Sequence, residues 1–168
     1  MEGVSPAIPI MIEYCKRVNE DTERPCTQAS AQLKGITELV EWLTHARACE
    51  ASGCTEGCTG GEGYADTKEY HDEEQAREFL TDSPLSVEVR TDWHTVGAVE
   101  AAKPTHYKIL LCWGGPAVQL VGTLDDANQP DSAQLQYQDW FTPWMGYPLT
   151  TEEEQTLITY AQQFSFDQ

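Results

Sequence analysis

The chain has 168 residues, 40% of them hydrophobic, and carries 28 Asp and Glu against 10 Lys and Arg, a formal net charge of −18. This length is sufficient for the core of one domain, 1–168, and no apolar run reaches the ~18 residues that a membrane-spanning helix needs. The strong negative charge argues against direct binding of nucleic acid, phosphate ligands or anionic membranes, because all of these are anions themselves.

The N-terminal half is expected to contain one long helix. Residues 1–28 combine proline with a short apolar run and predict an irregular N-terminal arm. From Ala29 onward, apolar residues recur every three or four positions, which predicts a helix over 29–49 with a single buried stripe. The Gly-rich stretch 50–65 has no periodicity, so it predicts a loop.

A second, acidic helix is expected over 66–81. Asp66 and Glu69 have the spacing of a capping box, in which the first side chain caps the helix and the second bonds back to it. Pro84 then ends the helical pattern, because proline cannot continue a helix.

The region 85–141 is expected to form a sheet. Apolar and polar residues alternate in LSVEVRTDW, and three further apolar runs, HYKILLCW, AVQLVGTL and AQLQYQDWF, follow after short polar links. Links this short require antiparallel pairing of neighbouring strands. A last helix over 150–165 begins at Thr150 or Thr151. The predicted fold class is α+β, a four-stranded antiparallel meander with helices packed on one face.

The segment YQDWFTPWMGYPL brings five aromatic residues together. Trp140 continues a strand, and Pro143 and Pro148 argue against regular structure in the remainder. We expect this segment to be core, or a lid over one end of the core. Tyr and Trp are also frequent anchors of protein interfaces, so a binding face is the alternative.

Four residues are the best candidates for metal ligands. His45 and Cys49 lie four positions apart on one helical face, and Cys54 and Cys58 follow in the Gly-rich loop. Four N and S ligands suit tetrahedral zinc. The usual CxxC spacing is missing, however, and the cysteines are equally consistent with an ordinary loop. We therefore expect no cofactor and keep a small zinc-binding or redox regulatory protein as an alternative.

A nucleophilic enzyme is a further alternative. Cys112 is the candidate nucleophile, with His94 or His106 as its base. Cys112 lies in an apolar strand, where a buried thiol behaves as a small hydrophobic group, so we expect no enzyme activity. Because no signal-length apolar segment follows Met1, we expect a cytoplasmic protein whose six cysteines are reduced.

The distribution of charge points to a protein partner. Lys108 is the last basic residue, and eight acidic residues follow it. The net charge of −18 equals that of about nine base pairs of DNA, roughly 30 Å of duplex. Such a surface attracts basic proteins, although acids spread evenly would give only solubility. The residues expected to contact the partner are Asp72, Glu73, Glu74, Glu78, Asp125, Asp126, Glu152, Glu153 and Glu154.

The segments LSVEVRTDWH, ILLCWGGPAVQLVGTLD and LQYQDWFTPWMGY resemble small acidic proteins encoded on bacteriophages, prophages and plasmids. The resemblance covers roughly the C-terminal half together with CEASGC and GYADTKEYHDEEQAREFL. It implies a setting in which accessory proteins block host CRISPR or restriction machinery, and it implies no catalytic residue. We therefore expect a non-enzymatic anti-CRISPR or anti-restriction inhibitor that binds a basic, nucleic-acid-handling host complex, as a DNA mimic.

Overall fold

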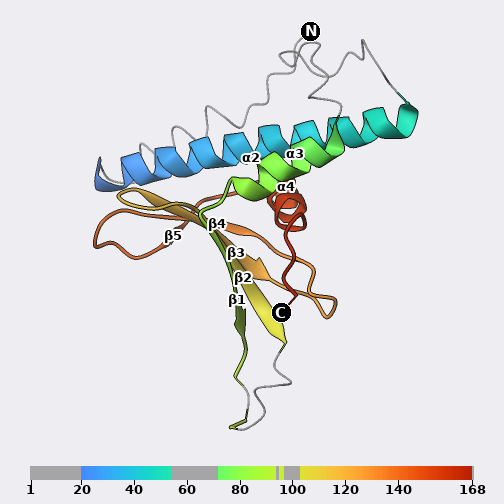
Figure 1. The fold of residues 1–168 in the computed structure, drawn as a ribbon. Coiled ribbons are helices and arrows are strands. Elements are labelled where there is room, and N and C mark those ends of the chain that lie inside the picture. Colours follow the sequence, from blue (N-terminus) through green and yellow to red (C-terminus); the bar gives the residue numbers. More distant parts are fainter. Residues whose placement is uncertain (1–19, 54–71, 94, 97–102, 168) are drawn as a thin grey trace.

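The computed structural model describes residues 20–53, 72–93, 95–96 and 103–167. It has an α+β fold of three helices and one five-stranded antiparallel sheet, with the helices gathered on one side of the sheet (Figure 1). None of the described helices is long and apolar enough to cross a bilayer.

Helix α2 (Glu20–Ser52) contains 33 residues and lies across the sheet. The predicted stripe is buried at Leu33, Ile36, Val40, Leu43 and Ala46 and only partly buried at Leu39, and Cys26, Ala29 and Cys49 extend it. The helix also includes 20–28, so the prediction of an irregular arm is wrong for those residues. Pro25 costs a helix about 3 kcal/mol, but it is itself buried beside the stripe. Each large side chain of the stripe contributes about 1.5–3 kcal/mol by burial, which offsets this cost.

Helix α3 (Glu73–Asp82) begins later than the sequence predicts. Its N-cap is Asp72, whose carboxylate accepts a hydrogen bond from the backbone N–H of Gln75 at 3.1 Å. The expected capping residue, Asp66, and its partner Glu69 lie outside the described residues. Ala76 and Leu80 are the buried side chains of this short acidic helix.

The sheet has one more strand than predicted. Its strands pair in chain order, which makes a meander, and they are β1 (Ser86–Thr91), β2 (Pro104–Cys112), β3 (Ala117–Thr123), β4 (Gln134–Gln138) and β5 (Met145–Gly146). The short β5 lies between Pro143 and Pro148, and Gln136 and Tyr137 pair with it. The two prolines cannot donate a backbone hydrogen bond, but the four residues between them can, and Met145 and Gly146 pair with β4. The expectation of no regular structure is therefore wrong for these two residues.

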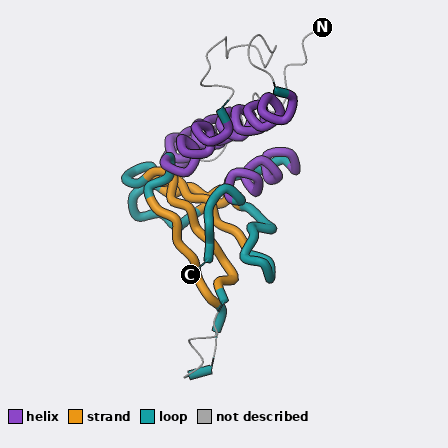
Figure 2. The backbone as a smooth tube through the Cα atoms, turned by 45° about the vertical axis from the view of Figure 1, so that its right-hand side comes forward, coloured by secondary structure: helices purple, strands orange, loops and turns teal. Residues whose placement is uncertain are grey.

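The two faces of the sheet differ in chemistry. Figure 2 shows the helices lying against one side of the sheet. On this face, Ile109, Leu120 and Leu135 lie side by side and are fully buried. We call this the core face. The opposite face, which we call the open face, carries the alternating polar residues, for example Glu88 beside Lys108. The predicted packing of helices on a single face is therefore confirmed for the described helices.

Helix α4 (Thr151–Ala161) ends the fold. Thr150 is its N-cap and forms a capping box with Glu153, in which each side chain bonds the other residue's backbone N–H. Leu157 and Tyr160 are buried against the core. Phe166 follows the helix and packs on Tyr107 of the core face, with ring centroids 5.2 Å apart.

Gly122 and Gly35 offer a test of this packing, because alanine should have opposite effects at the two positions. A Cβ at Gly122 would lie 2.1 Å from the backbone oxygen of Ser132, whereas a Cβ at Gly35 in α2 meets nothing within 4 Å. We expect Gly122→Ala to lower the free energy of unfolding by about 1–3 kcal/mol. Gly35→Ala should raise it by about 0.5–1 kcal/mol. Urea denaturation measures both, and equal values would contradict the packing around β3.

Candidate functional site

The nine predicted partner-binding acids fall into three groups in the structure. The first group is on α3, the second is in the turn between β3 and β4, and the third is in the first turn of α4. Several of these carboxylates also hold the fold together. Their structural roles determine which of them remain available to a partner.

On α3, two of the four acidic side chains make contacts that stabilise the fold, and the other two do not. Asp72 caps the helix. Glu73 pairs with Arg47 of α2 at 3.0 Å and with Arg77, and the hydrogen bond from Arg47 lowers the pKa of Glu73. Glu74 and Glu78 are exposed and make no ion pair within the described part of the chain. They are the carboxylates of α3 that a partner can reach.

In the turn between β3 and β4, Asp125 and Asp126 differ in the same way. The Asp125 carboxylate accepts hydrogen bonds from the backbone N–H groups of Ala127, at 2.8 Å, and Gln129, at 2.9 Å. It therefore shapes the turn. Asp126 is exposed.

Two of the three acidic groups converge on the C-terminal end of α4. Arg47, which binds Glu73, also donates to Gln163 at 2.9 Å. The neighbouring Gln162 donates to the backbone oxygen of Pro130, at the end of the turn, at 3.3 Å. These contacts bring the start of α3 and the β3–β4 turn to the same end of the molecule. We call this the acidic end.

The third group lies at the opposite end of α4. A helix of this length is about 16 Å long, so Glu152–Glu154 are separated from the acidic end by that distance. Glu153 belongs to the capping box. Glu154 is close enough to Tyr107 for its charge to act on that phenol: burial, with smaller contributions from Asp131 and Glu154, raises the pKa of Tyr107 well above its usual value. The third group is therefore separate from the other two, at the opposite end of α4.

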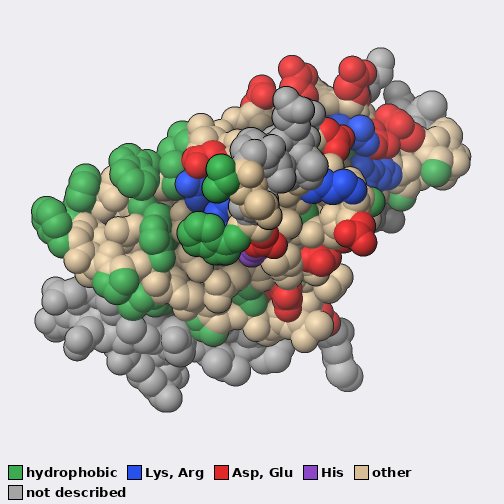
Figure 3. Space-filling model, turned by 90° about the horizontal axis from the view of Figure 1, so that it is seen from below, with side chains coloured by type: hydrophobic (Ala, Val, Ile, Leu, Met, Phe, Trp, Pro, Cys, Tyr) green, Lys and Arg blue, Asp and Glu red, His purple; other side chains and the backbone are tan. Residues whose placement is uncertain are grey.

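The described basic side chains do little to balance these acids. Lys34, Arg47, Arg77 and Lys108 each pair with a glutamate, namely Glu38, Glu73, Glu73 and Glu88. Figure 3 shows acidic and basic side chains gathered over one part of the surface and hydrophobic side chains over another. These four positive charges are thus already paired with acids, and the net charge of the chain remains −18.

The aromatic segment is core at its two ends and exposed in between. Tyr137 and Tyr147 are buried in edge contact, with ring centroids 6.4 Å apart, which confirms the core prediction for them. Trp140 and Phe141 are 62% and 102% exposed, and Trp113 of the neighbouring β2–β3 turn is 68% exposed. The prediction of a core lid is therefore wrong for Phe141.

Phe141 has a left-handed backbone, with φ of 64°, which costs a residue with a Cβ about 1–2 kcal/mol. We expect Phe141→Gly to raise the free energy of unfolding by about 0.5–1 kcal/mol, because glycine adopts this conformation without that penalty. Phe141→Ala is the control, since alanine keeps the Cβ and should bring no gain. Thermal and urea denaturation of the two variants would decide, and a gain with alanine would contradict the assignment to backbone strain.

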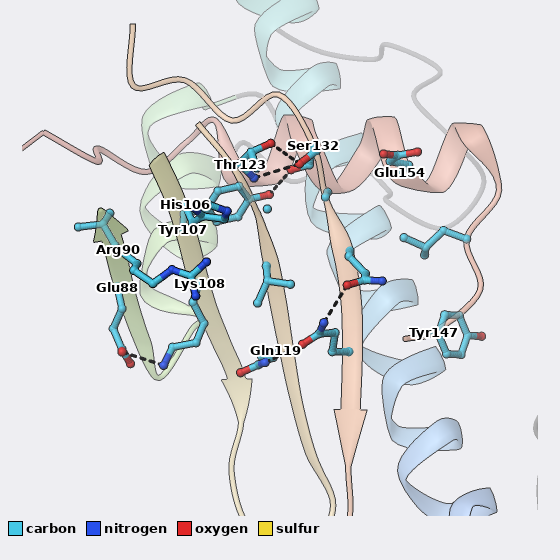
Figure 4. Close-up of a pocket in the computed structure, with 17 residues that line it drawn as sticks. Glu88, Arg90, His106, Tyr107, Lys108, Gln119, Thr123, Ser132, Tyr147 and Glu154 are labelled. Atoms are coloured by element: carbon cyan, nitrogen blue, oxygen red, sulfur yellow. Dashed lines mark hydrogen bonds and ion pairs between the residues drawn. The ribbon is translucent and has the colours of Figure 1, made fainter. Parts of the chain in front are cut away.

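A hollow of about 890 Å³ lies along the sheet, and the residues that line it are shown in Figure 4. Its polar groups bond one another: Lys108 pairs with Glu88 at 2.7 Å, and Gln119 donates to Gln136 at 2.8 Å. Period-two polar positions in the strands were the sequence signal for this surface, but we predicted no site there.

The candidate zinc ligands are partly described. Cys49 Sγ lies 3.4 Å from His45 Nε2, so the two share a helical face as expected. Cys54 and Cys58 lie outside the described residues. Within the described ranges, no group of three or more His, Cys, Asp or Glu side chains is arranged to hold a metal ion.

The cysteines depart from the sequence prediction in one respect. Cys26 is disulfide-bonded, so the expectation that all six cysteines are reduced is wrong. Burial raises the pKa of the Cys112 thiol, which disfavours the nucleophilic thiolate. His106 precedes Cys112 by six positions on β2, about 20 Å in an extended strand, so it is not the base of that thiol. His94 lies outside the described residues.

Glu73 makes stability depend on pH. Its pKa is below the ordinary value of 4.5 in the folded protein, so its ion pairs stabilise the fold at neutral pH, and this contribution disappears as the pH falls through the folded pKa. Glu73→Gln should therefore be less stable than the natural protein at pH 7 and should match it in acid. Urea titrations at pH 7 and at several values below pH 4.5 test this. Glu74→Gln, at a neighbouring exposed position, should change stability little at pH 7.

Comparison with known proteins adds no relative: no family model, curated protein or solved structure matches the chain.

Proposed function

We propose that this chain is a non-enzymatic inhibitor from a mobile element, which binds a basic, nucleic-acid-handling protein of a host defence system, CRISPR or restriction, in the place of DNA. The observation that carries the proposal is the acidic end. There, contacts through Arg47 and Gln162 bring the acids of α3 together with those of the β3–β4 turn.

The available carboxylates suit electrostatic recognition. Glu74, Glu78 and Asp126 are exposed and make no ion pair with another described residue. Acids of this kind steer a basic partner toward the surface and speed the encounter. A DNA-binding protein offers such a basic surface, because it neutralises phosphates with Lys and Arg. The resemblance to proteins of mobile elements supports the choice of a defence complex over other basic proteins.

The proposal includes a bacterial cytoplasm as the place of action, because CRISPR and restriction complexes meet foreign DNA there. The Cys26 disulfide stands against this location, since cytosolic thiols are normally kept reduced. The absence of enzyme activity is also part of the proposal.

Competition for DNA provides the test. Purified CRISPR effectors and restriction enzymes would be bound to fluorescent target DNA, and displacement by the protein would be followed by anisotropy at low and high salt. We expect displacement at low salt that weakens as salt screens the charges. If none of these enzymes releases DNA at low salt, the proposal is wrong.

Charge-reversal variants would locate the surface. Glu74→Lys with Glu78→Lys should weaken displacement about 10-fold, because close charge pairs across an interface are worth more than 1 kcal/mol. The matched control is Glu38→Lys with Glu41→Lys, which makes the same change in net charge on the exposed face of α2. An equal loss in the control would mean that total charge matters and the acidic end does not.

A second candidate function is a small zinc-binding or redox regulatory protein. The contact of 3.4 Å between Cys49 and His45 favours it, because two ligands of a tetrahedral site are already side by side. Metal analysis of native protein, with His45→Ala as the comparison, distinguishes it from the first. One zinc per chain that is lost in the variant would support it.

A further inference from the structure

The edge of the sheet formed by β1 has an exposed apolar border. In the described structure β1 pairs with β2 alone, so its other side ends the sheet (Figure 1). Leu85, Val87 and Trp93, which are 61%, 38% and 103% exposed, alternate along this strand and its continuations. Leu85, Val87 and Val89 are two residues apart, which places them on the core face, and Trp93 lies two residues beyond the end of β1. An uncovered strand edge of this kind is a template for pairing with another strand.

We propose that β1 pairs with β1 of a second copy of this chain, antiparallel and centred on Val89, so that the two sheets join into one of ten strands. This dimer does not depend on the acidic end or on the proposed inhibitory function.

Charge selects this register. In a two-fold antiparallel pair, residues of the same face lie opposite each other, so the two-fold axis passes beside one residue of the strand. An axis at Glu88 would oppose two glutamates, and an axis at Arg90 would oppose two arginines. An axis at Val89 instead places Glu88 of each copy opposite Arg90 of the other. The exposed side chains of Glu88 and Arg90 thus form two pairs of opposite charge, one on each side of the axis.

The same register also covers the apolar border. On the core face, Val89 meets its own copy and Val87 lies opposite Thr91. Leu85 and Trp93, which lie just beyond the two ends of β1, are brought to the same end of the pair. The positions that are exposed in a single chain are therefore the ones that receive a neighbour in the dimer. Cross-strand pairs of aromatic and aliphatic side chains stabilise a sheet by burying one another.

Glu88 already binds Lys108 at 2.7 Å on the open face, and its side chain remains 53% exposed. Arg90 of the second copy can therefore join this pair without breaking it. Figure 4 shows Glu88 and Arg90 on β1, at the border of the drawn sheet. In the dimer, Lys108, Glu88 and Arg90 of the second copy therefore form a row of alternating charges across the two paired strands.

Analytical ultracentrifugation of the purified chain tests the dimer without any partner. We expect the mass to rise from 18.8 kDa toward twice that value as the concentration is raised to about 100 µM, because a small interface associates weakly. High salt is used, since it screens the repulsion between two chains of net charge −18. A mass of one chain throughout would overturn the proposal.

Charge exchange tests the register. Arg90→Glu places a glutamate opposite Glu88 in both pairs of the dimer. It should weaken association about 10-fold, because like charges directly opposite destabilise a strand pair. Lys34→Glu, on exposed α2, makes the same change in net charge and should associate like the natural protein. Glu88→Arg combined with Arg90→Glu restores complementarity and should restore association. Equal behaviour of Arg90→Glu and Lys34→Glu, or failure of the double variant to recover, would overturn the register.

Cysteine crosslinking gives an independent measurement. In the proposed dimer, the two copies of Val89 lie directly opposite, within the Cα separation of about 4.4–6.8 Å that a disulfide spans. The two copies of Val87 are four residues apart along the strands, about 13 Å. Under mild oxidation, Val89→Cys should give a covalent dimer, and Val87→Cys should give only the background of the native cysteines. Equal crosslinking at the two positions would contradict the pairing.

Discussion

Burial of the core face beneath α2 is the constraint on which the rest of the structure depends. An antiparallel sheet with one apolar face is stable only when another layer covers that face. The stripe of α2, from Cys26 to Ala46, supplies much of this cover, and α4 with Phe166 extends it. Arg47, near the C-terminal end of α2, ties α3 to the end of α4 and thereby determines where the acidic groups meet.

Local sequence patterns predicted the features that local interactions decide. The stripe of α2 follows from helical spacing, and the cap of α4 follows from Thr150 and the glutamates after it. Features that depend on distant partners could not be read in the same way. Residues 20–28 are helical because Pro25 and Cys26 are buried in the core. Strand β5 forms because Met145 and Gly146 pair with Tyr137 and Gln136 of β4. The acids themselves were evident from the sequence, but their grouping depends on contacts made by Arg47 and Gln162.

Acidic side chains and exposed aromatic side chains lie at different places on the molecule. Acidic side chains meet where α3, the β3–β4 turn and the end of α4 converge, whereas Trp113, Trp140 and Phe141 are exposed on the turns at the ends of β2 and β4. Trp140 lies directly over Gly115, so close that a Cβ there would come 2.1 Å from its ring nitrogen. A glycine at this point therefore leaves the room that the Trp140 ring occupies. Phe141, which is held in a left-handed conformation, has no such packing reason for its position, and strain of this kind concentrates at functional surfaces.

The chain-order pairing of the strands has a consequence for how the protein folds. Every strand finds its partner in the next strand along the chain, so the sheet can grow by successive closures of short loops, each taking microseconds. Helix α2 is synthesised before the other described elements, but three of its partners, β3, β4 and α4, lie far later in the sequence. Docking against α4 has the longest sequence separation, so it closes the largest loop among the described elements. Until α4 is complete, part of the apolar stripe of α2 is exposed to solvent, and this interval is the period of greatest exposure to aggregation.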